Sequence, residues 1–237
     1  MFVLVDDYSR YTWTLFLPSK DKVFEEFQVL ISLLEKSLDT SLMAIRSDHG
    51  SEFQNASFLE YCRKKGITHN FSAPRTPQQN GVVERKNRTL ESMSRTMMIS
   101  NKVPRHFWAE AVNTACYILN RAMIRPQLNK TSSELLRGRK PNISHLRVFG
   151  SKCFVLNNGK NVLGKFDPRS DEGVFVGYVP NSKAYKVFNK RTKVVEESIH
   201  VVFDEKPRRT LIREPEEDAD PNEFLNLVRD ESDDEGE

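Results

Sequence analysis

Two carboxylates, Asp48 and Glu84, stand with 35 residues between them in segments that restrict how the chain can fold. The apolar run at 42–45 predicts a buried strand, and turn residues end it at Asp48. The segment 74–81 predicts a loop, because two prolines and an Asn-Gly pair break regular structure. A helix is expected next, with Glu84 in its first turn, where a negative charge is favoured. Asp48 is therefore expected at a strand end, and Glu84 at a helix start where it can face a neighbouring strand end.

Carboxylates delivered in this way suit divalent metal ions and phosphodiester chemistry. Magnesium takes oxygen ligands and usually keeps one or two protein carboxylates plus substrate phosphates. Two ions about 3.5–4 Å apart clamp the attacking and leaving oxygens of an in-line displacement. Either residue alone has a simpler interpretation, since an Asp near Gly is usually a turn residue and a first-turn Glu is usually a solvated cap. The metal hypothesis depends on the combination.

Apolar periodicity and turn residues predict the remaining organisation. We expect a hairpin of strands at 2–6 and 12–17, helices at 21–37, 55–65 and 105–122, a strand at 68–72, and short strands forming a small barrel within 146–203. In the helix at 105–122, the core is expected to contain Phe107, Ala111, Ala115 and Ile118, with Trp108 beside them.

Composition excludes several classes. The mean hydropathy of −0.57 and the lack of an 18-residue apolar run predict no membrane span. Three widely spaced cysteines, Cys62, Cys116 and Cys153, indicate reduced thiols in an intracellular protein. With no Cys-x-x-Cys beside the histidines, no zinc site is expected.

The formal charge of +3 conceals an asymmetry. Residues 204–237 hold 14 acidic and 5 basic side chains, whereas residues 1–203 hold 31 basic and 19 acidic ones. A basic body attracts phosphate backbones, although dispersed Lys and Arg can also simply solubilise a surface. Clusters at 63–65 and 85–88 favour nucleic acid. The acidic stretch 205–237 is expected to be disordered.

The order of motifs resembles the integrase segment of copia-type retrotransposon Pol polyproteins. The matching segments cover about 200 of the 237 residues: Val3–Trp13, Ile45–Phe53, Pro77–Arg88, Phe107–Ala111, Leu146–Gly150 and His200–Glu205. The resemblance implies an RNase H-like (retroviral integrase-like) α/β fold, a mixed sheet with flanking helices. It also implies a catalytic core at 1–122, a helical linker at 123–145 and a Src-homology-3-like β domain at 146–204.

The resemblance also assigns roles to individual residues. Asp48 and Glu84 match the second Asp and the Glu of a catalytic Asp-Asp-Glu triad that holds Mg²⁺ or Mn²⁺. Asn87 and Arg88 fall where the family's helix approaches DNA ends, and Gln79 and Asn80 fall in its active-site loop. Lys86 and Arg88 are expected to contact phosphates, which positions DNA without reading its sequence.

One departure concerns the first Asp of the triad. In the family it lies on a strand upstream of the one that ends in Val-Asp-Asp-Tyr-Ser, so this chain is expected to lack that central strand and its Asp. Asp6 is the candidate substitute; its other interpretation is a turn residue. The chain as written is therefore expected to fold poorly and to be catalytically inactive.

The function expected from the resemblance is DNA integration, the metal-dependent joining of element 3′ ends to target DNA. The expected partners are both DNAs and further copies of the full-length protein, in the nucleus, with no membrane. Two alternatives stay open: a non-catalytic nucleic-acid-binding remnant and an RNase H-like nuclease.

Overall fold

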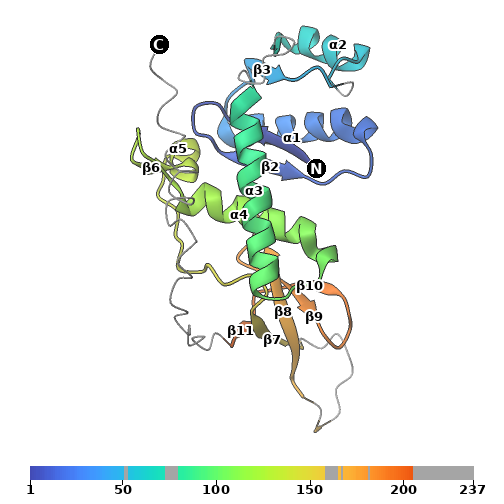
Figure 1. The fold of residues 1–237 in the computed structure, drawn as a ribbon, viewed down its shortest axis with the longest axis vertical. Coiled ribbons are helices and arrows are strands. Elements are labelled where there is room, and N and C mark those ends of the chain that lie inside the picture. Colours follow the sequence, from blue (N-terminus) through green and yellow to red (C-terminus); the bar gives the residue numbers. More distant parts are fainter. Residues whose placement is uncertain (51–52, 73–79, 158–164, 167, 181, 205–237) are drawn as a thin grey trace, which may run out of the picture.

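The computed structural model describes residues 1–50, 53–72, 80–157, 165–166, 168–180 and 182–204. Elements run from the strand pairs at one end, through the long helix α3 and the crossing helix α4, to a β domain at the other end (Figure 1). The predicted Gln79 and the acidic segment 205–237 lie outside the described residues.

The N-terminal α/β region extends from β1 to α3. Its elements are β1 (Phe2–Val5), β2 (Thr12–Leu15), η1 (Lys20–Lys22), α1 (Val23–Leu38), β3 (Ala44–Ser47), α2 (Ala56–Lys65), β4 (Thr68–Phe71) and α3 (Gly81–Ser100). β1 and β2 pair antiparallel across a short turn. β3 and β4 pair in parallel, which the crossover helix α2 makes possible. The predicted strands and helices of this region are confirmed, except that the buried strand expected at 42–45 lies instead at Ala44–Ser47 and is buried only at alternate residues, with Met43 75% exposed.

An aromatic core joins these elements. Phe58 of α2 is fully buried and its ring lies 5.2 Å from that of Phe27 in α1. Side chains of β1 and β3 pack against the same cluster. Helix α2 is fixed at both ends: the Asn55 Oδ1 accepts the Phe58 N–H at 2.7 Å, and Gly66 ends the helix with φ +69°.

Helix α4 connects the two ends of the molecule. The 3-10 turn η3 (Arg105–Phe107) leads into α4 (Trp108–Ala122), which packs on α3, on β2 and on the β domain. At β2, the buried Asn120 side chain accepts the Thr12 N–H at 2.9 Å and donates to the Thr12 C=O at 2.8 Å. The Asn120 amide thus satisfies both backbone groups of Thr12, as the backbone of a neighbouring strand would. The prediction that Trp108 is a core residue is wrong: its side chain is 50% exposed and packs edge-on against Phe16.

The C-terminal sheet follows a connection made of β5 (Ile124–Arg125), β6 (Lys130–Thr131) and α5 (Ser132–Arg137). Its strands are β7 (Lys152–Leu156), β8 (Ser170–Tyr178), β9 (Tyr185–Asn189), β10 (Val195–Ser198) and β11 (Val201–Phe203), in the order β10-β9-β8-β7-β11. β10 and β11 lie at opposite edges, yet three residue steps separate Ser198 from Val201. A chain of that length spans only about 10 Å, so the sheet must curl toward closure. The barrel prediction is confirmed.

Glycine permits close contact between this sheet and the helices. A Cβ on Gly150, whose φ is +82°, would lie 2.6 Å from side-chain atoms of Asn101 and Val103. Within the described ranges, no helix is long and apolar enough to cross a membrane.

Candidate active site and nucleic-acid interface

Asp48 follows β3 directly, at the carboxyl end of the parallel strand pair. Ile45 and Ser47 of β3 are buried, and Asp48 is the first exposed residue beyond them. Its Oδ1 accepts the Gly50 N–H at 3.0 Å, which closes the turn. The next residue, His49, stacks on Phe71 and its Nε2 lies 2.8 Å from the Ser72 carbonyl oxygen. The turn that presents Asp48 is therefore tied to the end of β4.

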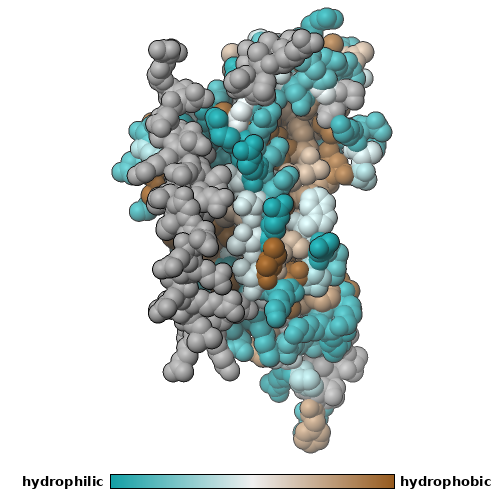
Figure 2. Space-filling view, in the orientation of Figure 1, coloured by the Kyte–Doolittle hydropathy of each residue, from teal (hydrophilic) through white to brown (hydrophobic). Residues whose placement is uncertain are grey.

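Glu84 lies in the first turn of α3, as predicted, and its side chain is exposed. Asn80 immediately precedes the helix as its N-cap residue, without a side-chain capping hydrogen bond. The partial positive charge of the helix N-terminus stabilises a carboxylate at this point. Glu84 and Arg88 are one helical turn apart, so both project from the same exposed side of α3. Figure 2 shows mainly hydrophilic side chains along the visible side of this helix.

The donor set suits a hard cation. Asp48 and Glu84 provide exposed carboxylate oxygens, the ligands that magnesium prefers. Thiolate ligands are disfavoured, because burial raises the pKa of Cys116 to about 11 and that of Cys153 to about 12. In the part of the chain that the structure describes, no three His, Cys, Asp or Glu side chains are grouped closely enough to hold a metal.

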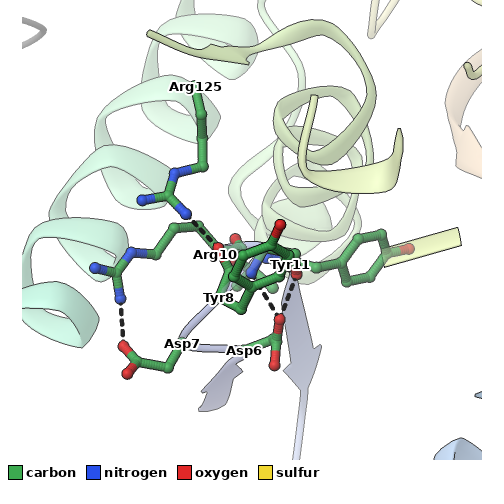
Figure 3. A network of polar contacts seen from close by, with 8 residues as sticks. Asp6, Asp7, Tyr8, Arg10, Tyr11 and Arg125 are labelled. Atoms are coloured by element: carbon green, nitrogen blue, oxygen red, sulfur yellow. Dashed lines mark hydrogen bonds and ion pairs between the residues drawn. The ribbon is translucent and has the colours of Figure 1, made fainter. Parts of the chain in front are cut away.

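Asp6 is used to build the turn between β1 and β2 (Figure 3). Its Oδ2 accepts hydrogen bonds from the Ser9 N–H at 2.8 Å and the Ser9 hydroxyl at 2.6 Å. Ser9 is fully buried, and its Oγ accepts the Tyr11 N–H. These contacts are those of a turn residue, which is the other interpretation of Asp6, rather than those of a metal ligand.

The predicted DNA-contacting residues on α3 point to different sides. Arg88 is exposed, while Lys86 is half-buried and lines a cavity beside α4. Asn87 is also half-buried, and its buried Oδ1 accepts no hydrogen bond from the described residues. Arg88 is thus the better placed of these to meet a phosphate on the Glu84 side.

Two aspects of the basic surface were not foreseen. In the cluster at 63–65, Lys64 pairs with Glu60 and Lys65 pairs with Glu35, which reduces its net charge. Arg10 and Arg125, in contrast, line the same cavity as Lys86. The two arginines are 115 positions apart, so no local sequence pattern predicts that they meet. In the structure, the turn that holds Arg10 is unusual because the φ of Arg10 is positive, at +58°.

Two family models match the chain. Residues 1–77 match the integrase core domain, and residues 151–216 match the retroviral polymerase SH3-like domain. The chain thus carries an integrase core segment followed by an SH3-like domain, and the predicted fold class is confirmed.

Similar proteins are Pol polyproteins of transposons. The chain is 38% identical over 206 residues to the retrovirus-related Pol polyprotein from transposon TNT 1-94 of Nicotiana tabacum, and 36% identical over 204 residues to that from transposon RE1 of Arabidopsis thaliana. These matches cover 87% and 86% of this chain but only 15% and 14% of the relatives. The chain therefore spans about one seventh of their length.

Solved structures with similarity include the HTLV-2 integrase catalytic core domain in complex with magnesium. That match has a TM-score of 0.45 and 23% identity, and covers 57% of this chain and 82% of the other. The simian T-cell lymphotropic virus intasome matches with a TM-score of 0.48 and 18% identity, covering 87% and 72%.

Proposed function

We propose that this chain, an integrase core segment related to the retrovirus-related Pol polyproteins of transposons, takes part in joining element DNA 3′ ends to target DNA. The observation that carries the proposal is the placement of Asp48 and Glu84. Asp48 directly follows a parallel strand, within the segment that matches the integrase core model, and Glu84 lies in the first turn of α3, in a chain that is similar to Pol polyproteins. Strand ends and helix starts of this kind are common positions for phosphate and metal chemistry.

Asp48 and Glu84 would hold Mg²⁺ or Mn²⁺, which stabilises the attacking and leaving oxygens of a phosphodiester exchange when it is bound. Asp48 is positioned by its turn, where Gly50 occupies only one carboxylate oxygen. Glu84 is held by the first turn of a helix 20 residues long, so its backbone is fixed. Arg88 and Asn80 flank Glu84 and would orient the phosphate backbone around the reacting bond.

Metal binding can be measured independently of activity. Paramagnetic Mn²⁺ added to the chain should broaden amide NMR signals around Asp48 and in the first turn of α3. Glu84→Gln keeps the size of the side chain but removes its charge, so it should abolish the α3 broadening in this chain, and strand transfer in the integrase segment restored to full length, while DNA binding persists.

The matched control is Glu91→Gln, an exposed glutamate two turns farther along the same helix. It should leave both signals and strand transfer unchanged. Broadening that persists in Glu84→Gln would remove Glu84 from the metal site.

A second function, nucleic-acid binding without catalysis, is favoured by one observation. In the described part of the chain no three His, Cys, Asp or Glu side chains are grouped closely enough to hold a metal, and Asp6 is engaged by Ser9. Strand transfer by the chain with Mg²⁺ or Mn²⁺ would contradict a purely nucleic-acid-binding function. Duplex binding with no transfer under either ion would support it.

The proposed partners are element and target DNA, and further copies of the polyprotein's integrase segment. The basic excess within residues 1–203 is suited to phosphate backbones. The proposed site of action is the nucleus, where target DNA is found.

A further inference from the structure

We infer that a small basic cavity beside α3 binds a backbone phosphate of DNA other than the reacting one. The cavity measures about 80 Å³ and opens where the β1–β2 turn, the start of α3, the end of α4 and the β5–β6 connection meet. This inference rests on the proposed function and extends it with a positioning contact. Its lining includes four cationic residues, Arg10, Arg85, Lys86 and Arg125, together with Leu119 of α4.

The lining has a strongly one-sided charge. Four of its side chains are cationic, and no carboxylate appears among the described residues that line it. Cations gathered around one small space repel one another, and a bound anion relieves that repulsion. A cavity of about 80 Å³ has room for several water molecules, which is enough space for a phosphate group.

Arg10 is held toward this cavity by a rigid turn. Its φ of +58° is unusual for a residue with a side chain, and such a conformation persists only where surrounding contacts impose it. Those contacts are the Arg10 N–H to the Asp6 carbonyl at 2.8 Å and the two hydrogen bonds from Ser9 to the Asp6 carboxylate. Arg10 also pairs with Asp7 at 2.6 Å, which offsets part of its charge, so the positive charge of the cavity comes mainly from Arg85, Lys86 and Arg125.

Arg125 reaches the same turn from a distant part of the chain (Figure 3). Its guanidinium donates to the Tyr8 carbonyl oxygen. A guanidinium carries five N–H donors, so this bond fixes the group while leaving donors for a phosphate. The Arg125 carbonyl also accepts the Asn129 N–H at 2.8 Å, which closes the connection between β5 and β6.

Two cations of α3 complete the cavity. Arg85 folds back over Gly81, with its Nη1 3.5 Å from the position of a Cβ there. Lys86 lines the cavity together with Leu119 of α4, so its side chain lies on the α4 side of the helix. Glu84 projects from a different side, so the cavity phosphate and the reacting phosphate would contact opposite flanks of one helical turn.

The test is the salt dependence of duplex DNA binding by the full chain, measured without divalent metal by fluorescence anisotropy. Each neutralised phosphate contributes about 0.9 to the slope of log affinity against log salt concentration. Arg125→Gln and Arg85→Gln should each weaken binding about tenfold and reduce the slope by about 1. Arg105→Gln, the same change at an exposed position beyond the other end of α3, should alter neither quantity.

Arg125→Lys keeps the positive charge, so it should preserve the slope of the parent. If Arg125→Gln does not fold, Arg85→Gln still tests the cavity. Slopes equal to that of the parent in both Gln variants would overturn the inference. A titration with inorganic phosphate distinguishes the source: phosphate that shifts the arginine side-chain NMR signals without changing DNA slopes identifies a free-anion site and also overturns it. A parent chain that does not bind duplex at all refutes the proposed function as well, whereas normal duplex binding with unchanged slopes refutes only the cavity.

Discussion

The N-terminal α/β region and the C-terminal sheet bury similar aromatic cores but organise their strands differently. β7 to β11 form one continuous hydrogen-bonded sheet, whereas β1–β2 and β3–β4 are separate pairs within the described residues. A two-stranded unit is marginal by itself, so these pairs depend on the packing of α1, α2 and α3. The segment that carries Asp48 and Glu84 therefore depends on side-chain packing more than on strand pairing for its geometry.

The largest expected effect comes from equivalent truncations in the two cores. Phe58 and Phe175 are both fully buried and each contacts several aromatic rings. Replacing either with Ala should reduce the free energy of unfolding by about 3–5 kcal/mol. Hydrogen exchange should show that Phe58→Ala exposes β1 to β4 while the C-terminal sheet stays protected. Loss of protection in both regions at once would break the comparison, because it would make the chain one cooperative unit.

A smaller effect is expected at Asn120, which links α4 to β2. Its side chain satisfies both the N–H and the C=O of Thr12, and each buried group left unsatisfied costs about 1–3 kcal/mol. Asn120→Leu should therefore lower the urea midpoint and accelerate exchange of the Thr12 amide. Asn113→Leu is the control: Asn113 is exposed and accepts a hydrogen bond from the Thr14 hydroxyl, so its loss should change stability by about 0.5 kcal/mol or less. Equal effects would mean that Asn120 contributes only packing.

These long-range contacts also mark what the sequence could not predict. Periodicity located α1, α2, α3 and α4 because each buries an apolar stripe, and turn residues placed Asp48 and Glu84 at element ends. The partnership of Asn120 with Thr12 spans 108 positions and has no local pattern. The exposure of Trp108 depends on which neighbours cover η3 and α4, which periodicity does not encode.

Thiol labelling compares the regions through their own cysteines. Cys62 lies in α2, Cys116 in α4 and Cys153 in β7, and all three are buried. Burial raises the pKa of each thiol, so labelling at neutral pH requires local opening. Cys62 should react first and Cys153 last, with a tenfold rate ratio for each 1.4 kcal/mol difference in opening free energy. Mass spectrometry after timed labelling checks the order, and faster labelling of Cys153 than of Cys62 would reverse the proposed ranking of the regions.

The smallest expected effect is a pH dependence carried by one histidine on each side of the comparison. Burial lowers the pKa of His69, beside β3, and of His145, whose Nε2 lies 2.8 Å from the Tyr117 hydroxyl; the charges of Arg121 and Arg147 lower the pKa of His145 further. Because each folded-state pKa lies below the unfolded value of 6.5, the unfolded chain takes up protons first as the pH falls. Stability should therefore be constant with respect to these groups above that value and decline below it. Urea midpoints should be measured across about pH 5 to 8. The decline of the midpoint with falling pH should be smaller in His69→Gln and in His145→Gln than in the parent. At low pH, His69→Gln should raise hydrogen-exchange protection, relative to the parent, only in β1 to β4. His145→Gln should raise it only where α4 contacts the C-terminal sheet. This pair of results would show that the two regions respond to pH separately. A stability that rises as the pH falls through this range would contradict the buried, neutral state of both rings.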